Sequence, residues 1–378
     1  MKSIFRNRSI LTNKENLEHL YTLKSFPVFM GCVDTPVQDD LTTDMVWDMC
    51  RDTGIIQLRG LIPLEILYLN QHNEGLGKIW QGHYVEFAKF IKKYNDKKNI
   101  LEIGGAHDWI ANNYMGICPD ANWTIIEPNP QNISNTKVNL IKGWFDGKFT
   151  YNKPVDTIIH SHVFEHVYNP FEFIKHISLF LKCGDKHIFS FPNMLPMLEK
   201  KYTSCLNFEH SVFLTEEIAD YIIQKAGFKI LGKQYYKDAH SIFYATEKLK
   251  DAFVDITLEN KYFEYKKVFN DFVNYHFDLI DELNQKIKNS NLPIYLFGAH
   301  IFSQYLMGFG LKDSKIISLL DNSPTKQGKR LYGTSLKVES PKILAGKGRV
   351  NVILKAGVYN DEIKKNILEN INSEVVFW

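Results

Sequence analysis

Apolar runs and a helical stretch alternate between residues 99 and 130. The first run, 99–103, ends at two glycines, a stretch with helical spacing follows, and the second run, 123–126, ends at Glu127. Two apolar runs joined in this way predict a βαβ unit with parallel strands. A ligand of such a unit binds at the carboxyl ends of the strands, where glycines allow close approach and the helix start offers free N–H groups.

The loop between the first run and the helix indicates which ligand this is. Ala106 and Asp108 stand where a dinucleotide fingerprint has glycines, so no grip for a pyrophosphate is evident. This favours an adenosine ligand without phosphates over NAD. Glu127 is placed to accept hydrogen bonds from both hydroxyls of a ribose. The predicted cofactor-binding residues here are Glu102, Gly104, Gly105, Glu127 and Pro128.

The same stretch resembles the first two motifs of class I S-adenosylmethionine (SAM) methyltransferases, in which an acid-x-Gly-x-Gly loop is followed by a ribose-binding acid. The resemblance implies an α/β fold with a Rossmann-like core, and SAM as the cofactor. It also implies Trp144, Phe145 and Asp146 near the adenine, and Ser161 and His162 in a loop that closes on SAM. The alternatives are a βα turn of another Rossmann-like protein and, at 144–145, a buried aromatic pair.

The pattern between residues 96 and 248 predicts the rest of such a core. Thr215, with two glutamates behind it, reads as a helix N-cap, and Gly227 lies at the C′ position of the same helix. The last two strands are expected to form an antiparallel edge. The predicted strands are 155–160, one within 184–193, 228–234 and 241–246, and the predicted helices are 85–93, 171–181 and 215–226.

The first 95 residues are expected to form a separate lobe, with strand-like runs at 24–31 and 54–58 and a polar loop at 39–50 that leads into an apolar segment. Cys50 begins a run that looks like the second half of the small zinc-binding lobe of sugar C-methyltransferases. That family has a Cys-x-x-Cys pair there, but this chain has Thr53 at the second position. Four soft ligands cannot be assembled, so we predict a lobe without metal. The alternative is a rebuilt site that uses a histidine.

The run from Asn207 to His210 is similar to a Tyr-x-Glu-His run of the same family, with Asn207 in place of the tyrosine. Glu209 beside His210 suits general-base work, because a carboxylate raises the pKa of a histidine and orients its ring. The alternative is a surface pair before a helix. The resemblance implies that His210, Glu209 and His166 are catalytic.

The connector before residue 85 supplies a tyrosine to the active site in the resembling family. By spacing from His83, His72 occupies that place here, unless these side chains only pack the lobe against the core. The candidate substrate-binding residues are His72, Asn207, His240, Tyr359 and Asn360.

The last third of the chain has two parts. Residues 249–290 have apolar positions at helical spacing, which predicts a long amphipathic helix that packs on the core. Residues 291–378 carry apolar runs at 292–297, 316–320 and 350–355, which predict a second Rossmann-like α/β domain. This domain resembles the C-terminal domain of the sugar C-methyltransferases, which implies a nucleotide-sugar substrate.

The composition limits which kinds of partner the chain is expected to bind. Lys and Arg number 45 against 43 Asp and Glu and are spread along the chain, so no nucleic-acid partner is implied. No apolar run approaches the length of a membrane span, and the five cysteines are scattered, so we expect a reduced, cytoplasmic protein off the membrane, as a monomer or homodimer.

These observations predict a SAM-dependent methyltransferase that acts on a nucleotide-linked keto-sugar, with C-methylation favoured. Methylation of oxygen or nitrogen on a related sugar is the first alternative. A sugar oxidoreductase that uses NAD in the C-terminal domain, and a sugar-binding protein without activity, are the others. The expected division is a lobe at 1–95, a core at 96–248, a linker at 249–290 and a last domain at 291–378.

Overall fold

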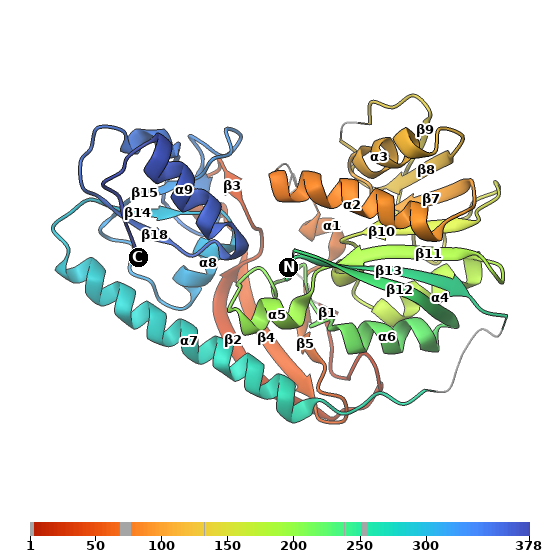
Figure 1. Ribbon diagram of the computed structural model, residues 1–378. Helices are drawn as coiled ribbons and strands as arrows, with labels where there is room; N and C mark the ends of the chain where they lie inside the picture. Colours follow the sequence, from red (N-terminus) through yellow and green to blue (C-terminus); the bar gives the residue numbers. More distant parts are fainter. Residues whose placement is uncertain (1–3, 69–76, 132, 238, 251–255) are drawn as a thin grey trace.

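The computed structural model describes residues 4–68, 77–131, 133–237, 239–250 and 256–378. Figure 1 shows a large sheet with helices on both faces, a smaller C-terminal sheet, and an N-terminal lobe that lies between the two. The sites of interest lie where these three parts meet.

The large sheet has seven strands in the order β12-β13-β11-β10-β7-β8-β9. Five neighbouring strands are parallel, and β13 runs antiparallel to both β11 and β12, as the sequence predicted. The strands are β7 (Asn99–Ile103), β8 (Asn122–Glu127), β9 (Val138–Lys142), β10 (Thr157–Ser161), β11 (Lys186–Phe191), β12 (Phe228–Tyr236) and β13 (Ser241–Lys248).

Apolar side chains cover both faces of this sheet because its central strands are buried on each side. Ile158 on β10 packs with one layer of helices and its neighbour Ile159 with the other, following the two-residue period of a strand. One layer holds α2 (Lys78–Tyr94) and α3 (Trp109–Ile117), and the other holds α4 (Pro170–Phe180) and α6 (Glu216–Lys225), while α5 (Met194–Glu199) packs on the long helix at 262–289.

Local signals set the helix ends. The Thr215 side chain accepts a hydrogen bond from the Ile218 N–H, and Gly227 has φ +84°, so both predicted caps of α6 are confirmed. The helix α2 begins at Lys78, seven residues before the predicted start at 85.

The N-terminal lobe is built on an antiparallel sheet with the order β2-β4-β5. The segment 39–50, expected to be a loop that enters an apolar segment, is instead a strand from residue 42 onward, and its last four residues are buried. The elements of the lobe are β1 (Ile4–Phe5), β2 (Leu17–Pro27), β3 (Cys32–Val33), β4 (Thr42–Cys50), β5 (Ile56–Leu58), β6 (Gly60–Leu61) and α1 (Leu64–Leu67).

The C-terminal sheet is parallel throughout, with the order β17-β15-β14-β18-β19. The three apolar runs predicted as strands are confirmed as β14, β15 and β18, and the amphipathic linker is the 28-residue helix α7. The elements are α7 (Tyr262–Asn289), β14 (Ile294–Phe297), α8 (Ile301–Gly308), β15 (Ile316–Leu320), β16 (Arg330–Leu331), β17 (Val338–Glu339), β18 (Asn351–Leu354), α9 (Asn360–Asn370) and β19 (Val376–Phe377).

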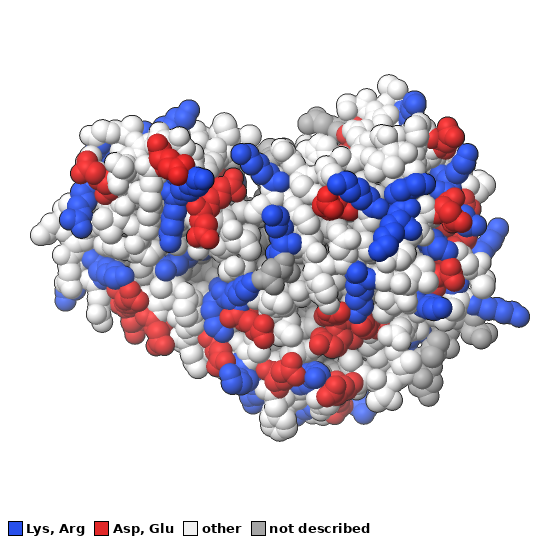
Figure 2. All heavy atoms as spheres, in the orientation of Figure 1, with Lys and Arg blue, Asp and Glu red and all other residues white. Residues whose placement is uncertain are grey.

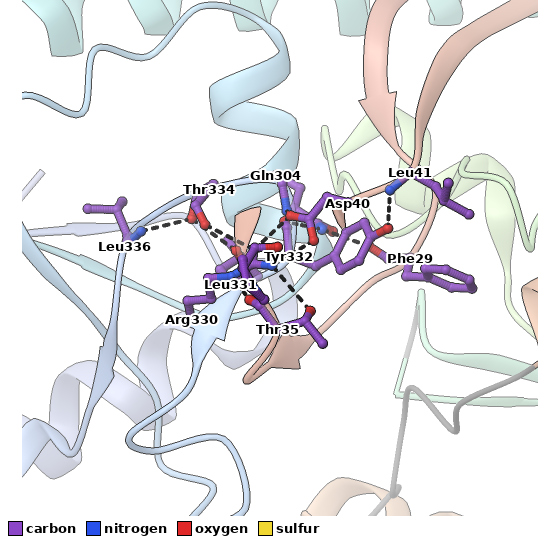
Figure 3. A network of polar contacts seen from close by, with 12 residues as sticks. Phe29, Thr35, Asp40, Leu41, Gln304, Arg330, Leu331, Tyr332, Thr334 and Leu336 are labelled. Carbon is purple, nitrogen blue, oxygen red and sulfur yellow. Dashed lines mark hydrogen bonds and ion pairs between the residues drawn. The ribbon is translucent and has the colours of Figure 1, made fainter. Parts of the chain in front are cut away.

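A polar network joins the C-terminal part to the N-terminal lobe, where β16 pairs with β3 (Figure 3). Arg330 donates to both carboxylate oxygens of Asp40 at 2.7 Å, and the two side chains are only 11 % and 3 % exposed. Gln304 on α8 donates to the backbone carbonyls of Phe29 and Tyr332. The other acceptors of Arg330 are the carbonyls of Thr35, Pro36 and Thr334 and the hydroxyl of Thr35.

The surface carries both charges in mixture. On the face in Figure 2, Lys and Arg side chains are interspersed with Asp and Glu, and no large area has a single sign. Of the helices that the structure describes, none has both the length and the apolar character that crossing a membrane requires.

A pair of buried histidines makes the stability of the core sensitive to pH. His160 on β10 and His187 on β11 lie with their Nε2 atoms 3.0 Å apart, and burial lowers the pKa of His187 to about 3. Between pH 6.5 and 3 the unfolded chain therefore binds a proton at this position that the folded chain does not bind, and stability falls as the pH falls.

In His187→Gln, we expect neither the folded nor the unfolded chain to bind a proton at this position. Below about pH 6, the free energy of unfolding of the wild type then falls by about 1.4 kcal/mol more per pH unit than that of the variant. Urea unfolding at several pH values between 7.5 and 4.5 measures both curves. Parallel curves would show that His187 is not held neutral in the fold.

Candidate active site

The loops after β7, β8 and β10 meet at the carboxyl edge of the large sheet. Gly104 follows β7 with φ +78°, and a Cβ at this position would lie 2.4 Å from Cγ2 of Val163 in the loop after β10. A Cβ on Gly105 would lie 2.9 Å from the Glu102 carboxylate. Only glycine fits at either position, because the backbone must pass closely over its neighbours.

Glu102 lies beneath this turn and not in an open site. It is 2 % exposed, its Oε2 accepts a hydrogen bond of 2.7 Å from the Trp123 indole, and burial raises its pKa to about 8. We predicted Glu102 as a cofactor contact. The structure corrects this to a supporting role, because its carboxylate faces Gly105 and Trp123 under the loop.

Glu127 ends β8 at the same edge. Its Oε1 accepts a hydrogen bond of 2.8 Å from the backbone N–H of Asn129, and burial raises its pKa. Among the described residues, no hydrogen bond reaches its Oε2, so one carboxylate oxygen is available to a ligand. Asn129 in turn donates to the carbonyl of Tyr68, which brings the connector from the first lobe next to this site.

These residues fit an adenosine ligand such as SAM. Glu127 offers an acceptor for ribose hydroxyls at the carboxyl edge of the sheet, next to the close turn at Gly104 and Gly105. When bound, SAM supplies a methyl group on a cationic sulfur, which is already activated for transfer.

A second cluster lies beside the first and holds the predicted catalytic residues. His166 Nδ1 is 3.6 Å from Oε2 of Glu209, and the rings of His166 and His210 have centroids 4.8 Å apart. The ring of Tyr68 lies 6.5 Å from that of His166 and 5.8 Å from that of Trp144. The structure therefore brings together four predicted residues, which are Trp144, His166, Glu209 and His210.

The tautomer of His210 follows from its backbone partners. Its Nδ1 lies 3.0 Å from the carbonyl oxygen of Ser204 and 3.2 Å from that of Cys205, and a carbonyl can only accept. Nδ1 therefore carries the hydrogen, and Nε2 of the neutral ring keeps its lone pair. Burial lowers the pKa of His210 below its usual value, so the ring is neutral and can take a proton at pH 7.

Asn207, a predicted substrate contact, makes hydrogen bonds to the backbone of its own loop. Its Oδ1 accepts hydrogen bonds from the backbone N–H groups of Glu209 and His210, and its Nδ2 donates to the carbonyl of Ser204. The side chain is 2 % exposed and shapes the loop that carries His210.

Two side chains from distant elements fix this loop. Arg6 donates to the carbonyl and hydroxyl of Ser211 and to the carbonyl of Tyr168, so it ties the loop after His210 to the loop after His166. The hydroxyl of Tyr305 on α8 donates to the carbonyl of Leu206. The catalytic loop is thus held from both the N-terminal lobe and the C-terminal part.

A third group lies around Trp80, near the start of α2. The rings of His162 and His240 lie 4.7 Å from Trp80, and both histidines contact the hydroxyl of Ser241, at 2.8 and 2.7 Å. His162 has φ +53°, a strained backbone for a residue with a side chain. The side chain of Trp80 lies close to the Tyr359 hydroxyl, so the core and the C-terminal part meet at this position.

The remaining predicted residues lie elsewhere. Phe145 is partly buried and packs with Phe149 and Phe180 against α4. The side chains of Asp146 and Asn360 accept hydrogen bonds from their own turns, at Lys148 and Ala356. Ser161 contacts Ser190, Pro128 follows Glu127 at the sheet edge, and His72 lies outside the described residues.

Sequence reasoning missed Glu165 and Tyr68. Glu165 is buried between the histidines at 162 and 166, with Oε1 3.1 Å from His162 Nδ1. A lone acid inside a histidine-rich run was the signal for it. Tyr68 ends the connector segment that precedes the undescribed residues 69–76, and burial raises its pKa well above 10. An aromatic in this connector was its signal.

Replacing Glu127 with alanine is expected to weaken the binding of S-adenosylhomocysteine (SAH) by about 10- to 100-fold, because charge-assisted hydrogen bonds are worth about 1.5–3 kcal/mol. Titration calorimetry measures the affinity. Asp120→Ala is the matched control, because Asp120 is an exposed acid before the opposite end of β8. Equal affinity in both variants would exclude Glu127 from the cofactor site.

Comparison with known families agrees with this geometry. Residues 82–232 match the model of a methyltransferase domain. This segment contains the strands β7 to β11 and the start of β12, together with Gly104, Glu127, His166, Glu209 and His210 at the carboxyl edge of the sheet. The enzyme is a SAM-dependent methyltransferase with a class I, Rossmann-like core, and SAM is its cofactor. A search of curated proteins finds no match.

Solved structures of low similarity include several methyltransferases. The N-methyltransferase NodS from Bradyrhizobium japonicum is 13 % identical, with 46 % of this chain and 98 % of that chain covered and a TM-score of 0.37. A putative methyltransferase from Listeria monocytogenes is 12 % identical, covering 43 % and 97 %, with a TM-score of 0.35. The plantazolicin methyltransferase BpumL with SAH is 14 % identical, covering 45 % and 84 %, with a TM-score of 0.35.

Proposed function

We propose that the enzyme transfers a methyl group from SAM to a nucleotide-linked keto-sugar, at a carbon beside the ketone, with His210 as the general base. The observation that carries this proposal is the fixed tautomer of His210, which leaves a lone pair on Nε2 in a ring that lies beside the ring of His166. A base of this kind uncovers the nucleophile by removing a proton, which is the step that SAM does not assist.

The other residues of the cluster support that step. Glu209 lies against Nδ1 of His166 and orients its ring, while Glu165 favours the charged form of His210 after the proton has been taken. Tyr68 keeps its hydroxyl proton, because burial raises its pKa, and can donate a hydrogen bond to the oxygen that becomes negative beside the deprotonated carbon.

The C-terminal part supports a large, two-part substrate. Its strand ends carry Tyr359, which reaches Trp80 of the core, so a molecule in the active site can extend toward this second sheet. An NAD role is not favoured, because both carboxylate oxygens of Asp321, at the tip of β15, accept hydrogen bonds from Ala299 and Ser323. In a dinucleotide fold that acid binds the ribose.

Incubation of the enzyme with SAM and a panel of nucleoside diphosphate sugars tests the proposal by mass spectrometry. We expect a gain of one methyl group on a keto-sugar and exchange of the proton beside the ketone in D2O. Methylation without such exchange would support transfer to oxygen or nitrogen. Absence of any methylated nucleotide sugar, with SAH bound normally, would overturn the sugar substrate.

A further inference from the structure

Glu165, His166 and His210 form a group with the chemistry of a metal site. One ligand atom of each residue lies within 4.8 Å of the others, and among the described residues this is the one group of three or more His, Cys, Asp or Glu side chains so arranged. The group lies at the carboxyl edge of the large sheet, where Glu165 and His166 belong to the 3-10 turn after β10.

The carboxylate of Glu165 lacks the partners that a buried charge needs. The residue is 1 % exposed, and neither of its oxygens meets hydrogen-bond geometry with a described residue. Its Oε1 is 3.1 Å from His162 Nδ1 and 3.8 Å from His166 Nε2. A carboxylate in this position costs free energy unless a proton or a cation compensates for it.

Both histidines are held as metal ligands are usually held. His210 donates its Nδ1 hydrogen to the carbonyl of Ser204, so Nε2 has a free lone pair, and His166 has Glu209 against Nδ1 and Glu165 near Nε2. In metal sites a carbonyl or carboxylate commonly binds the outer nitrogen of each histidine in this way. The ring of His166 is 23 % exposed, which gives an ion a way in.

We propose that Glu165, His166 and His210 bind a divalent transition-metal ion such as Zn2+, and that the bound ion blocks methyl transfer. Two imidazole nitrogens and one carboxylate oxygen suit Zn2+ or Co2+, whereas Mg2+ and Ca2+ prefer oxygen ligands throughout. Ligands at the usual distances from zinc lie about 3.4 Å apart, so the side chains draw together by roughly an ångström on binding.

The block follows from the lone pair on His210. An ion that occupies Nε2 leaves the base unable to take a proton, so added metal inhibits and a chelator restores activity. The inhibition of methyl transfer by the ion rests on the proposed function, but the binding of the ion does not. The sequence predicts a chain without metal, and this proposal differs from that prediction. The proposed ion lies in the core and not at the cysteines of the first lobe.

Cobalt titration of protein without a histidine tag, stripped of metal beforehand, tests the binding. The wild type is expected to bind one Co2+ with visible d–d absorption that Zn2+ abolishes. Glu165→Gln and His166→Gln are each expected to weaken this binding at least about tenfold. His19→Gln, at an exposed position, is the matched control and binds as the wild type does. Far-ultraviolet circular dichroism confirms that each variant is folded.

The outcomes separate the parts of the proposal. Absence of saturable cobalt absorption in the wild type, or equal binding by Glu165→Gln, would overturn the site. Binding that leaves methyl transfer unchanged or raises it would overturn the block. If no sugar is methylated under any condition, the proposed substrate fails while the cobalt titration still decides the metal site.

Discussion

His210→Asn is expected to lower the rate of methyl transfer by about 10²- to 10⁴-fold, the usual contribution of a general base. Asparagine fills similar space and can keep a hydrogen bond to the carbonyl of Ser204, but it has no nitrogen that accepts a proton. SAH affinity is expected to change by less than about twofold, because a group that acts only in the transition state does not contribute to ground-state binding.

Methyl transfer is followed by mass spectrometry and SAH affinity by calorimetry, with His19→Gln as the control for loss of a histidine elsewhere. The pH profile gives a second readout. Burial lowers the pKa of His210 below 6.5, so the rate of the wild type falls only once the pH drops below that value. Full activity in His210→Asn, or loss of SAH binding together with activity, would contradict the base role.

Much of the large sheet could be predicted because its strands are buried on both faces. The runs that became β7, β8, β10 and β11 have large apolar residues at their centres, and turn residues bound them. The strand β9 could not be predicted in this way. It lies at the edge of the sheet, and only Val138 among its five residues is buried.

In the candidate site, too, some residues could be predicted from the sequence and others could not. Residues at strand tips, such as Glu127 and Gly104, follow from local pattern, because the end of a parallel strand is where ligands bind. Arg6 and Tyr305 do not follow from it. They reach the catalytic loop from 205 and 99 residues away along the chain, and their role depends on how the three parts pack. The backbone hydrogen bonds of Asn207 likewise do not follow from the local sequence.

Arg330→Met is expected to lower the free energy of unfolding by about 3–5 kcal/mol, the usual cost of breaking a buried ion pair. The variant leaves the Asp40 carboxylate, 3 % exposed, without its two charged hydrogen bonds, and it also removes the donors to three backbone carbonyls. Urea unfolding measures the change. Arg8→Met is the matched control and is expected to cost less than about 1 kcal/mol, because Arg8 and Glu15 are both more than half exposed.

A double variant distinguishes the loss of the pair from the penalty of one stranded charge. Replacing Asp40 with leucine in the Arg330→Met background removes both charges, so the two single costs are not expected to add, and part of the stability returns. The backbone carbonyls that Arg330 served stay unpaired in the double variant, so recovery is incomplete. If Arg330→Met costs no more than Arg8→Met, the pairing of β16 with β3 would not depend on this ion pair, and apolar packing between the two parts would be what holds them together.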